Sequence, residues 1–223
     1  MKINPNIKGI LFDMDGTVLD SEGIFSDAQI ELLKEYNIKS NHSELEEFKG
    51  MSHYIFYPSF MKKFNIVEDI DIIRFKLRNH LHNIMETKLK YIKGFENFYI
   101  SIIKDSNLET GLVTNTTRTT FKKIQQFINI DYYFSFVITI TEAIEPKPSP
   151  KPYLQAMNHF SINPSETLII EDSKTGLISA VDSGAQVIGL TTSLLPNQIK
   201  KISSKIIVVD SYSEIKKIVN FKH

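Results

Sequence analysis

Six short apolar runs recur along the chain, and their spacing constrains the fold more than any other feature of the sequence. The runs are rich in isoleucine, valine and leucine and cover residues 9–12, 110–114, 136–140, 167–171, 186–190 and 206–210. Continuous apolar runs of this length are typical of strands that are buried on both faces of a parallel sheet. Between the later runs, apolar residues fall three and four positions apart, as they do in helices. This alternation predicts a doubly wound α/β sheet.

One segment, residues 20–91, breaks the alternation of strands and helices. It shows helical periodicity, for example at Phe25, Ala28 and Leu32, and it contains no run that predicts a strand. A connection this long is not a simple crossover between two strands. The sequence therefore predicts a Rossmann-like core formed by residues 1–19 and 92–223, with an all-helical cap domain at 20–91 inserted after the first strand.

Composition and charge exclude several classes of protein. The 223 residues include 26 basic and 26 acidic side chains, so the formal net charge is zero, which argues against a nucleic-acid partner. The sequence contains no cysteine, which excludes disulfides, cysteine–zinc sites and thiolate nucleophiles. No apolar run is long enough to span a bilayer, and the N-terminal segment lacks the apolar region of a signal peptide. We therefore expect a cytoplasmic protein without a membrane partner, as a monomer or weak dimer.

Two carboxylates, Asp13 and Asp15, directly follow the first apolar run. In open α/β sheets, ligands bind at the carboxyl ends of the strands. Two like charges this close repel each other, and burial raises the cost, so a bound cation would relieve both problems. Because the available ligands are oxygens, the pair predicts a site for a hard divalent ion, Mg²⁺ first.

Three further polar segments follow later apolar runs, and all four together resemble the motifs of the haloacid dehalogenase superfamily, in the branch with a helical cap. The segments are Asp13-Met14-Asp15-Gly16-Thr17, Leu112-Val113-Thr114-Asn115, Lys147-Pro148-Ser149-Pro150 and Glu171-Asp172-Ser173-Lys174-Thr175-Gly176. They occur in the order of the family's motifs, and the resemblance covers essentially the whole chain. It implies a phosphatase, or an enzyme like the β-phosphoglucomutases of the same branch.

The resemblance also implies a role for each motif. Asp13 would be the nucleophile that forms an aspartyl-phosphate, and Asp15 would be the general acid and then the general base. Thr114 and Asn115 would bind the phosphoryl oxygens with hydroxyl, amide and backbone N–H donors. The metal ligands would be the Asp13 and Asp172 carboxylates and the Asp15 backbone carbonyl, and Glu171 would act at the metal directly or through water.

A lysine completes the implied catalytic set. Lys147 would bind the phosphate and neutralise the negative charge that gathers on the carboxylates. Lys151 lies four residues later and is the competing choice, but the K-P-x-P spacing selects Lys147. The surrounding prolines would stiffen the loop that carries this lysine.

The expected reaction is hydrolysis of a small phosphorylated metabolite, such as a sugar or polyol phosphate. Dehalogenases of the superfamily lack the second aspartate, so Asp15 favours phosphoryl chemistry. In related caps, a segment like Lys49-Gly50-Met51-Ser52 sets substrate specificity, which implies that Gly50 and the following His53 contact the substrate.

Two alternatives stay open. The first is a phosphosugar mutase of the β-phosphoglucomutase type, although Phe25 and His53 stand where such enzymes carry a histidine and an arginine. The second is a non-catalytic module that binds a partner through its helical cap.

Overall fold

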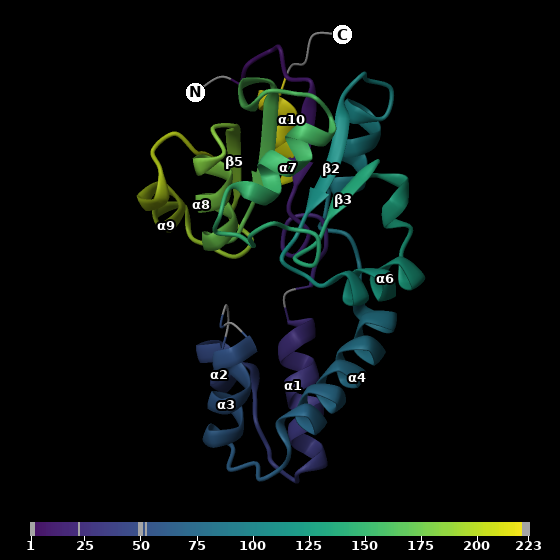
Figure 1. Cartoon of the computed structure of the whole chain (residues 1–223), viewed down its shortest axis with the longest axis vertical. Helices are drawn as coiled ribbons and strands as arrows, with labels where there is room; N and C mark the ends of the chain where they lie inside the picture. Colours follow the sequence, from purple (N-terminus) through teal and green to yellow (C-terminus); the bar gives the residue numbers. More distant parts are fainter. Residues whose placement is uncertain (1–2, 22, 49–50, 52, 220–223) are drawn as a thin grey trace. The chain divides into compact units, whose positions relative to one another are not determined.

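The computed structural model describes residues 3–21, 23–48, 51 and 53–219 of the chain. It contains two compact units (Figure 1). Residues 1–20 and 90–223 form one unit, here called the sheet unit, and residues 21–89 form the other, here called the helical unit.

The sheet unit is built on six parallel strands. They are, in chain order, β1 (Gly9–Phe12), β2 (Glu109–Val113), β3 (Phe136–Ile138), β4 (Thr167–Glu171), β5 (Gln186–Leu190) and β6 (Ile207–Val209). The order across the sheet is β3-β2-β1-β4-β5-β6, and every neighbouring pair is parallel. The chain thus starts in the middle of the sheet, winds to one edge and then to the other. This confirms the predicted doubly wound sheet.

Helices connect the strands and cover both faces of the sheet (Figure 1). They are α5 (Phe95–Phe98), the π-helical turn η2 (Tyr99–Ile103), α6 (Arg118–Phe127), η3 (Ile130–Tyr132), α7 (Lys151–His159), η4 (Pro164–Glu166), α8 (Lys174–Asp182), α9 (Pro196–Ile202) and α10 (Tyr212–Ile218). Helix α8 is followed by Gly184, whose φ of 81° is the left-handed conformation expected at that position.

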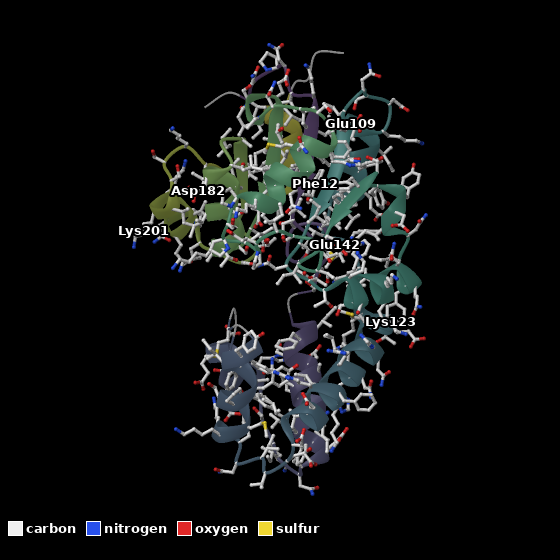
Figure 2. All side chains as sticks on the ribbon, in the orientation of Figure 1. Phe12, Glu109, Lys123, Glu142, Asp182 and Lys201 are labelled. Atoms are coloured by element: carbon white, nitrogen blue, oxygen red, sulfur yellow. The ribbon has the colours of Figure 1, made fainter. Side chains whose placement is uncertain are left out.

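Side chains that alternate along β1 build two apolar cores. Leu11 faces α7 and α8 and belongs to a fully buried cluster with Tyr153 and Leu177. Phe12 points to the opposite face, where its ring lies edge-on to Phe95 of α5 at 5.8 Å between centroids. Figure 2 shows Phe12 in the interior of the sheet unit. Burial on both faces explains why the strands read as continuous apolar runs.

The two segments that join the units run side by side within the sheet unit. Leu19 and Tyr91 form an antiparallel bridge, and the Asp20 backbone N–H donates to the Lys90 carbonyl at 2.9 Å. These contacts fix the positions at which the chain leaves the sheet unit and returns to it.

The helical unit has its own apolar core. Its elements are α1 (Ile24–Glu35), α2 (His42–Leu45), η1 (Glu46–Phe48), α3 (His53–Lys63) and α4 (Ile70–Lys88). Phe48, Phe56 and Phe60 pack together in its centre with centroid distances of 5.3–5.7 Å. The Asp69 side chain caps α4 by accepting from the Asp71 backbone N–H at 2.7 Å.

The third strand is shorter than the apolar run predicts. The third strand ends at Ile138 rather than at residue 140, because the Thr139 hydroxyl and backbone N–H both donate to the Glu142 carboxylate, at 2.6 and 3.0 Å, and turn the chain.

Among the described residues, no helix is both long and apolar enough to cross a membrane.

Candidate functional site

Three neighbouring strands end at the same edge of the sheet, and polar side chains follow each of them. Asp13 follows β1, Thr114 follows β2 and Asp172 follows β4. Because β1 lies between β2 and β4, these residues are neighbours in space although the chain separates them widely. Figure 2 shows the two ends of the strands, with Glu109 at the start of β2 and Glu142 in the loop after β3.

Lys147 makes hydrogen bonds to several residues at this edge of the sheet. Its ammonium donates to Asp13 Oδ1 at 2.6 Å, to Glu171 Oε1 at 2.7 Å and to the Val113 carbonyl at 2.7 Å. The lysine side chain is only 3% exposed. An ammonium has three donors, and here their acceptors are Val113 at the end of β2, Glu171 at the end of β4 and Asp13 directly after β1. The lysine therefore ties β1, β2 and β4 together.

The competing lysine lies elsewhere. Lys151 begins α7, and its side chain is 44% exposed and pairs with Glu145 at the surface. Of the two lysines considered from the sequence, the structure brings Lys147 to Asp13.

Glu171 is completely buried and accepts hydrogen bonds on both oxygens. Besides Lys147, Oε1 accepts from the Tyr153 hydroxyl at 3.1 Å. Oε2 accepts from the backbone N–H groups of Asp172 and Ser173 at 2.9 and 3.0 Å, and from the Ser173 hydroxyl at 3.2 Å. A Cβ on Gly176 would overlap this carboxylate, which accounts for a glycine at that position. Five protein donors thus hold the Glu171 side chain.

Asp172 is held by hydroxyl groups. Thr17 Oγ1 donates to Oδ1 at 2.9 Å, and the Ser193 hydroxyl is hydrogen-bonded to Oδ2. The neighbouring Thr192 hydroxyl donates to the Gly16 carbonyl at 2.6 Å. Gly16 has a φ of 80°, and a Cβ there would collide with the Asp172 carboxylate. The first motif and the loop after β5 therefore pack against Asp172 together.

A hydrogen bond joins Asp15 to Thr116, the residue after the second motif. The Thr116 hydroxyl donates to Asp15 Oδ2 at 2.9 Å. The Thr116 backbone N–H donates to Thr114 Oγ1, also at 2.9 Å, which leaves the Thr114 hydroxyl proton for another acceptor. The Asn115 amide contacts the backbone of Lys147.

Asp13, Glu171 and Asp172 form a buried carboxylate cluster. Each offers an oxygen, and these oxygens lie within 4.8 Å of one another. The Asp15 side chain is not part of this cluster.

Charge in the cluster is unbalanced, because three carboxylates face one lysine. Burial, and then the charge of Glu171, raises the pKa of Asp13 well above its usual value, although Lys147 opposes the shift. The same two causes raise the pKa of Asp172 to about 7. Burial would lower the pKa of Lys147, but the charges of Asp13 and Glu171 outweigh it and raise the pKa. A divalent cation would relieve this excess of negative charge, and the oxygen donors suit a hard ion. The residues fit Mg²⁺.

Sequence reasoning missed four polar residues at this edge. None of the four motifs includes Tyr153, Thr116, Thr192 or Ser193. For the last two a signal existed, because they are the second and third residues after the end of β5. Of the residues predicted to contact the substrate from the cap, Gly50 lies outside the described residues, and His53 begins α3 while its side chain also lies outside them.

The chain is similar to known hydrolases over most of its length. A family model described as haloacid dehalogenase-like hydrolase matches residues 10–190. A pyrophosphatase PpaX from Oceanobacillus iheyensis is 26% identical over 92% of this chain and 94% of its own length. A phosphorylated carbohydrates phosphatase from Thermotoga maritima is 20% identical over 84% of this chain and 87% of its own.

Solved structures share the fold. A Thermotoga maritima protein provisionally described as a β-phosphoglucomutase superposes with a TM-score of 0.85 and 18% identity, covering 96% of this chain and all of that one. At this identity the likeness shows the fold alone.

Proposed function

Because the chain belongs to the haloacid dehalogenase-like hydrolase family, we propose that it is a Mg²⁺-dependent phosphatase. Its substrate would be a small phosphorylated metabolite, and the reaction would pass through an aspartyl-phosphate on Asp13. Membership confirms the family predicted from the four motifs and the prediction that the chain is an enzyme, a hydrolase. The observation that carries the proposal is the buried contact between Lys147 and Asp13 beside Asp172.

In the first half of the reaction, an oxygen of the Asp13 carboxylate attacks phosphorus. The bond between phosphorus and the leaving oxygen breaks, and Asp15 gives that oxygen a proton. Asp13 suits this role because Lys147 fixes one of its oxygens by a hydrogen bond, which orients the carboxylate.

In the second half, Asp15 takes a proton from water, and the water oxygen attacks phosphorus. The bond to Asp13 breaks, and inorganic phosphate leaves. The hydrogen bond from Thr116 supports this step, since it orients the Asp15 carboxylate. The proton count balances, because Asp15 begins and ends the cycle protonated.

Two groups after β2 suit the phosphoryl oxygens. The Thr114 hydroxyl proton and the Asn115 backbone N–H would donate to oxygens that gain charge in the transition state. Lys147 would supply a fixed positive charge beside them.

The proposed metal ligands are Asp13, Asp172 and the Asp15 backbone carbonyl. Bound Mg²⁺ supplies positive charge that stabilises the transferring phosphoryl group. The prediction of Glu171 as a further ligand stays a prediction, and the five donors on its oxygens support a role in fixing Lys147 instead.

A sugar or polyol phosphate is the proposed substrate, with support from the carbohydrate phosphatase relative. Inorganic pyrophosphate is the second candidate, favoured by the name of the more similar relative. A phosphosugar mutase is less favoured because Phe25, where such enzymes carry a histidine, is apolar and packs on Phe56 at 5.2 Å. The contacts of Gly50 and His53 with substrate, the cytoplasmic location and the monomeric or weakly dimeric state stay predictions.

A panel assay tests the proposal. Purified protein would be given phosphorylated sugars and polyols, pyrophosphate and p-nitrophenyl phosphate, with Mg²⁺ and with EDTA. We expect release of phosphate that requires Mg²⁺, with one sugar or polyol phosphate preferred. Turnover of no phosphate compound would overturn the proposal and favour the non-catalytic module, while isomerisation of a phosphosugar without phosphate release would identify a mutase.

A further inference from the structure

We propose that the side chain of Asn115 is a positioning residue for Lys147, and that it acts on the Lys147 backbone rather than on the phosphoryl group. The inference deepens the proposed function, on which it rests for its catalytic consequence. It changes the role implied for the Asn115 amide, while leaving the Asn115 backbone N–H free for substrate.

The contact is reciprocal. Asn115 Nδ2 donates to the Lys147 carbonyl at 3.0 Å, and the Lys147 backbone N–H donates to Asn115 Oδ1 at 3.1 Å. Both polar atoms of the amide therefore contact one residue, which lies 32 positions later in the chain. The pair resembles the exchange of two hydrogen bonds between strands, made here by one side chain between two loops.

The chemistry of this contact requires an amide. Asparagine offers a donor and an acceptor on one short, planar group. Aspartate would retain the acceptor but would place a second oxygen against the Lys147 carbonyl. Leucine would retain the shape and lose both hydrogen bonds, leaving the Lys147 N–H and carbonyl without these partners.

The position of the Lys147 backbone matters because the ammonium at the other end of the side chain is held in place. The Lys147 ammonium uses all three donors, on Asp13, Glu171 and the Val113 carbonyl, at 2.6–2.7 Å. The acceptors lie at, or directly after, the ends of three hydrogen-bonded strands. A displacement of the lysine backbone would therefore lengthen these bonds or force the side chain from its rotamer. Misplacement of a catalytic group by about 1 Å costs on the order of 100-fold in rate.

Other contacts hold the same loop but not at the lysine. The Ser179 hydroxyl donates to the Ser149 carbonyl at 2.6 Å, and Arg118 forms two hydrogen bonds with Glu142, both at 2.9 Å. With the loop braced on both sides, loss of the Asn115 amide is expected to shift Lys147 locally and to leave the fold intact.

The test combines Asn115→Leu with Lys147→Ala in a double-mutant cycle on the full chain. The matched control is Asn129→Leu, because Asn129 is exposed and its side chain caps no helix. Single-turnover rates with p-nitrophenyl phosphate and enzyme in excess extend the measurable range. Hydrogen exchange of peptides that cover residues 141–149 reports the loop independently of activity.

We expect Asn115→Leu to lower the single-turnover rate about 100-fold, and to add less than about threefold when Lys147 is already alanine. The same variant should speed hydrogen exchange in the loop, and Asn129→Leu should change neither measurement. Unchanged exchange in the loop would overturn the inference. So would equal losses in both backgrounds, since they would mean that the amide acts on the phosphoryl group itself. If neither the wild-type protein nor any variant turned over phosphate esters, the proposed function would be wrong. Hydrogen exchange in the loop would still show whether Asn115 holds it.

Discussion

The ammonium of Lys147 lies 2.6 Å from the Asp13 carboxylate, and 134 residues separate the two along the chain. Both side chains are almost fully buried. Burial of an ion pair gives little net stability by itself, because both charges lose water. Stability alone therefore does not account for the arrangement, and the catalytic role proposed for the two residues has consequences that can be measured.

Replacement of Lys147 by methionine should abolish most activity and destabilise the protein. The change leaves Asp13 and Glu171 buried without their cation, which costs about 3–5 kcal/mol when a buried pair is broken. We expect kcat/KM to fall by roughly three orders of magnitude, or about 4 kcal/mol of transition-state stabilisation. Steady-state kinetics and urea unfolding measure the two effects, and a loss below about tenfold in kcat/KM would contradict the assigned role.

Lys151→Met is the matched control for this substitution. It removes the same charge four residues away, where the lysine pairs with Glu145 at the surface. Activity and unfolding should stay close to those of the wild-type protein. A loss as large as that of Lys147→Met would mean that the wrong lysine has been assigned.

Gly16→Ala should be more harmful than Gly23→Ala. Both glycines have a positive φ, 80° and 89°, so an alanine at either position should lower the free energy of unfolding by about 1–2 kcal/mol because of its left-handed conformation. Only at Gly16 would the new Cβ collide with the Asp172 carboxylate, whereas at Gly23 none of the described residues apart from the chain neighbours comes within 4 Å of it. Urea unfolding should show the larger loss for Gly16→Ala, together with lost activity; equal losses would show that the close approach of Asp172 is unimportant.

The Mg²⁺ dependence of activity should distinguish the role of Asp172 from that of Glu171. Asp172→Asn removes a proposed ligand, so the Mg²⁺ concentration for half-maximal activity should rise more than about 100-fold. Glu171→Gln keeps a side chain of the same shape but weakens the hold on Lys147, so it should lower kcat with a smaller shift in Mg²⁺ requirement. Titration of activity with Mg²⁺ measures both, and a larger Mg²⁺ shift for Glu171→Gln would identify Glu171 as a direct ligand.

Without metal, the stability of the protein should depend on pH through Asp172. Burial, and then the charge of Glu171, raises its pKa from the usual 3.8 to about 7. Between these values the folded protein binds the proton more tightly than the unfolded chain, so the free energy of unfolding falls as pH rises. Urea unfolding in EDTA should show this fall, and Asp172→Asn should flatten it. A slope unchanged by the substitution would contradict the raised pKa.

The sequence was sufficient for the sheet and for most residues at its carboxyl edge. Asp13 could be predicted because an apolar run ends just before it, the resemblance to the family's motifs added Thr114 and Asp172, and the strand order brings the three together. The K-P-x-P spacing likewise separated Lys147 from Lys151. These features depend on local pattern, which a single sequence displays.

Side-chain partners could not be predicted in the same way. Tyr153 has an apolar ring that fits the helical pattern of α7, and only the folded structure shows its hydroxyl on Glu171. Nothing in the sequence indicates that both atoms of the Asn115 amide contact Lys147, since that depends on how two loops pack. The predicted end of β3 was two residues too late. Thr139 donates a hydrogen bond to Glu142 and turns the chain there, and a pattern of apolar residues does not predict such a polar contact.

The most direct test is to find the phosphoryl group on Asp13. In the Asp15→Asn variant, acetyl phosphate should still phosphorylate the enzyme, because its leaving group needs no proton, while attack by water lacks its general base. Acid quenching during the first turnover, followed by peptide mass spectrometry, should then locate a phosphoryl group on Asp13. A phosphoryl group on another side chain, or turnover that persists in Asp13→Asn, would contradict the account.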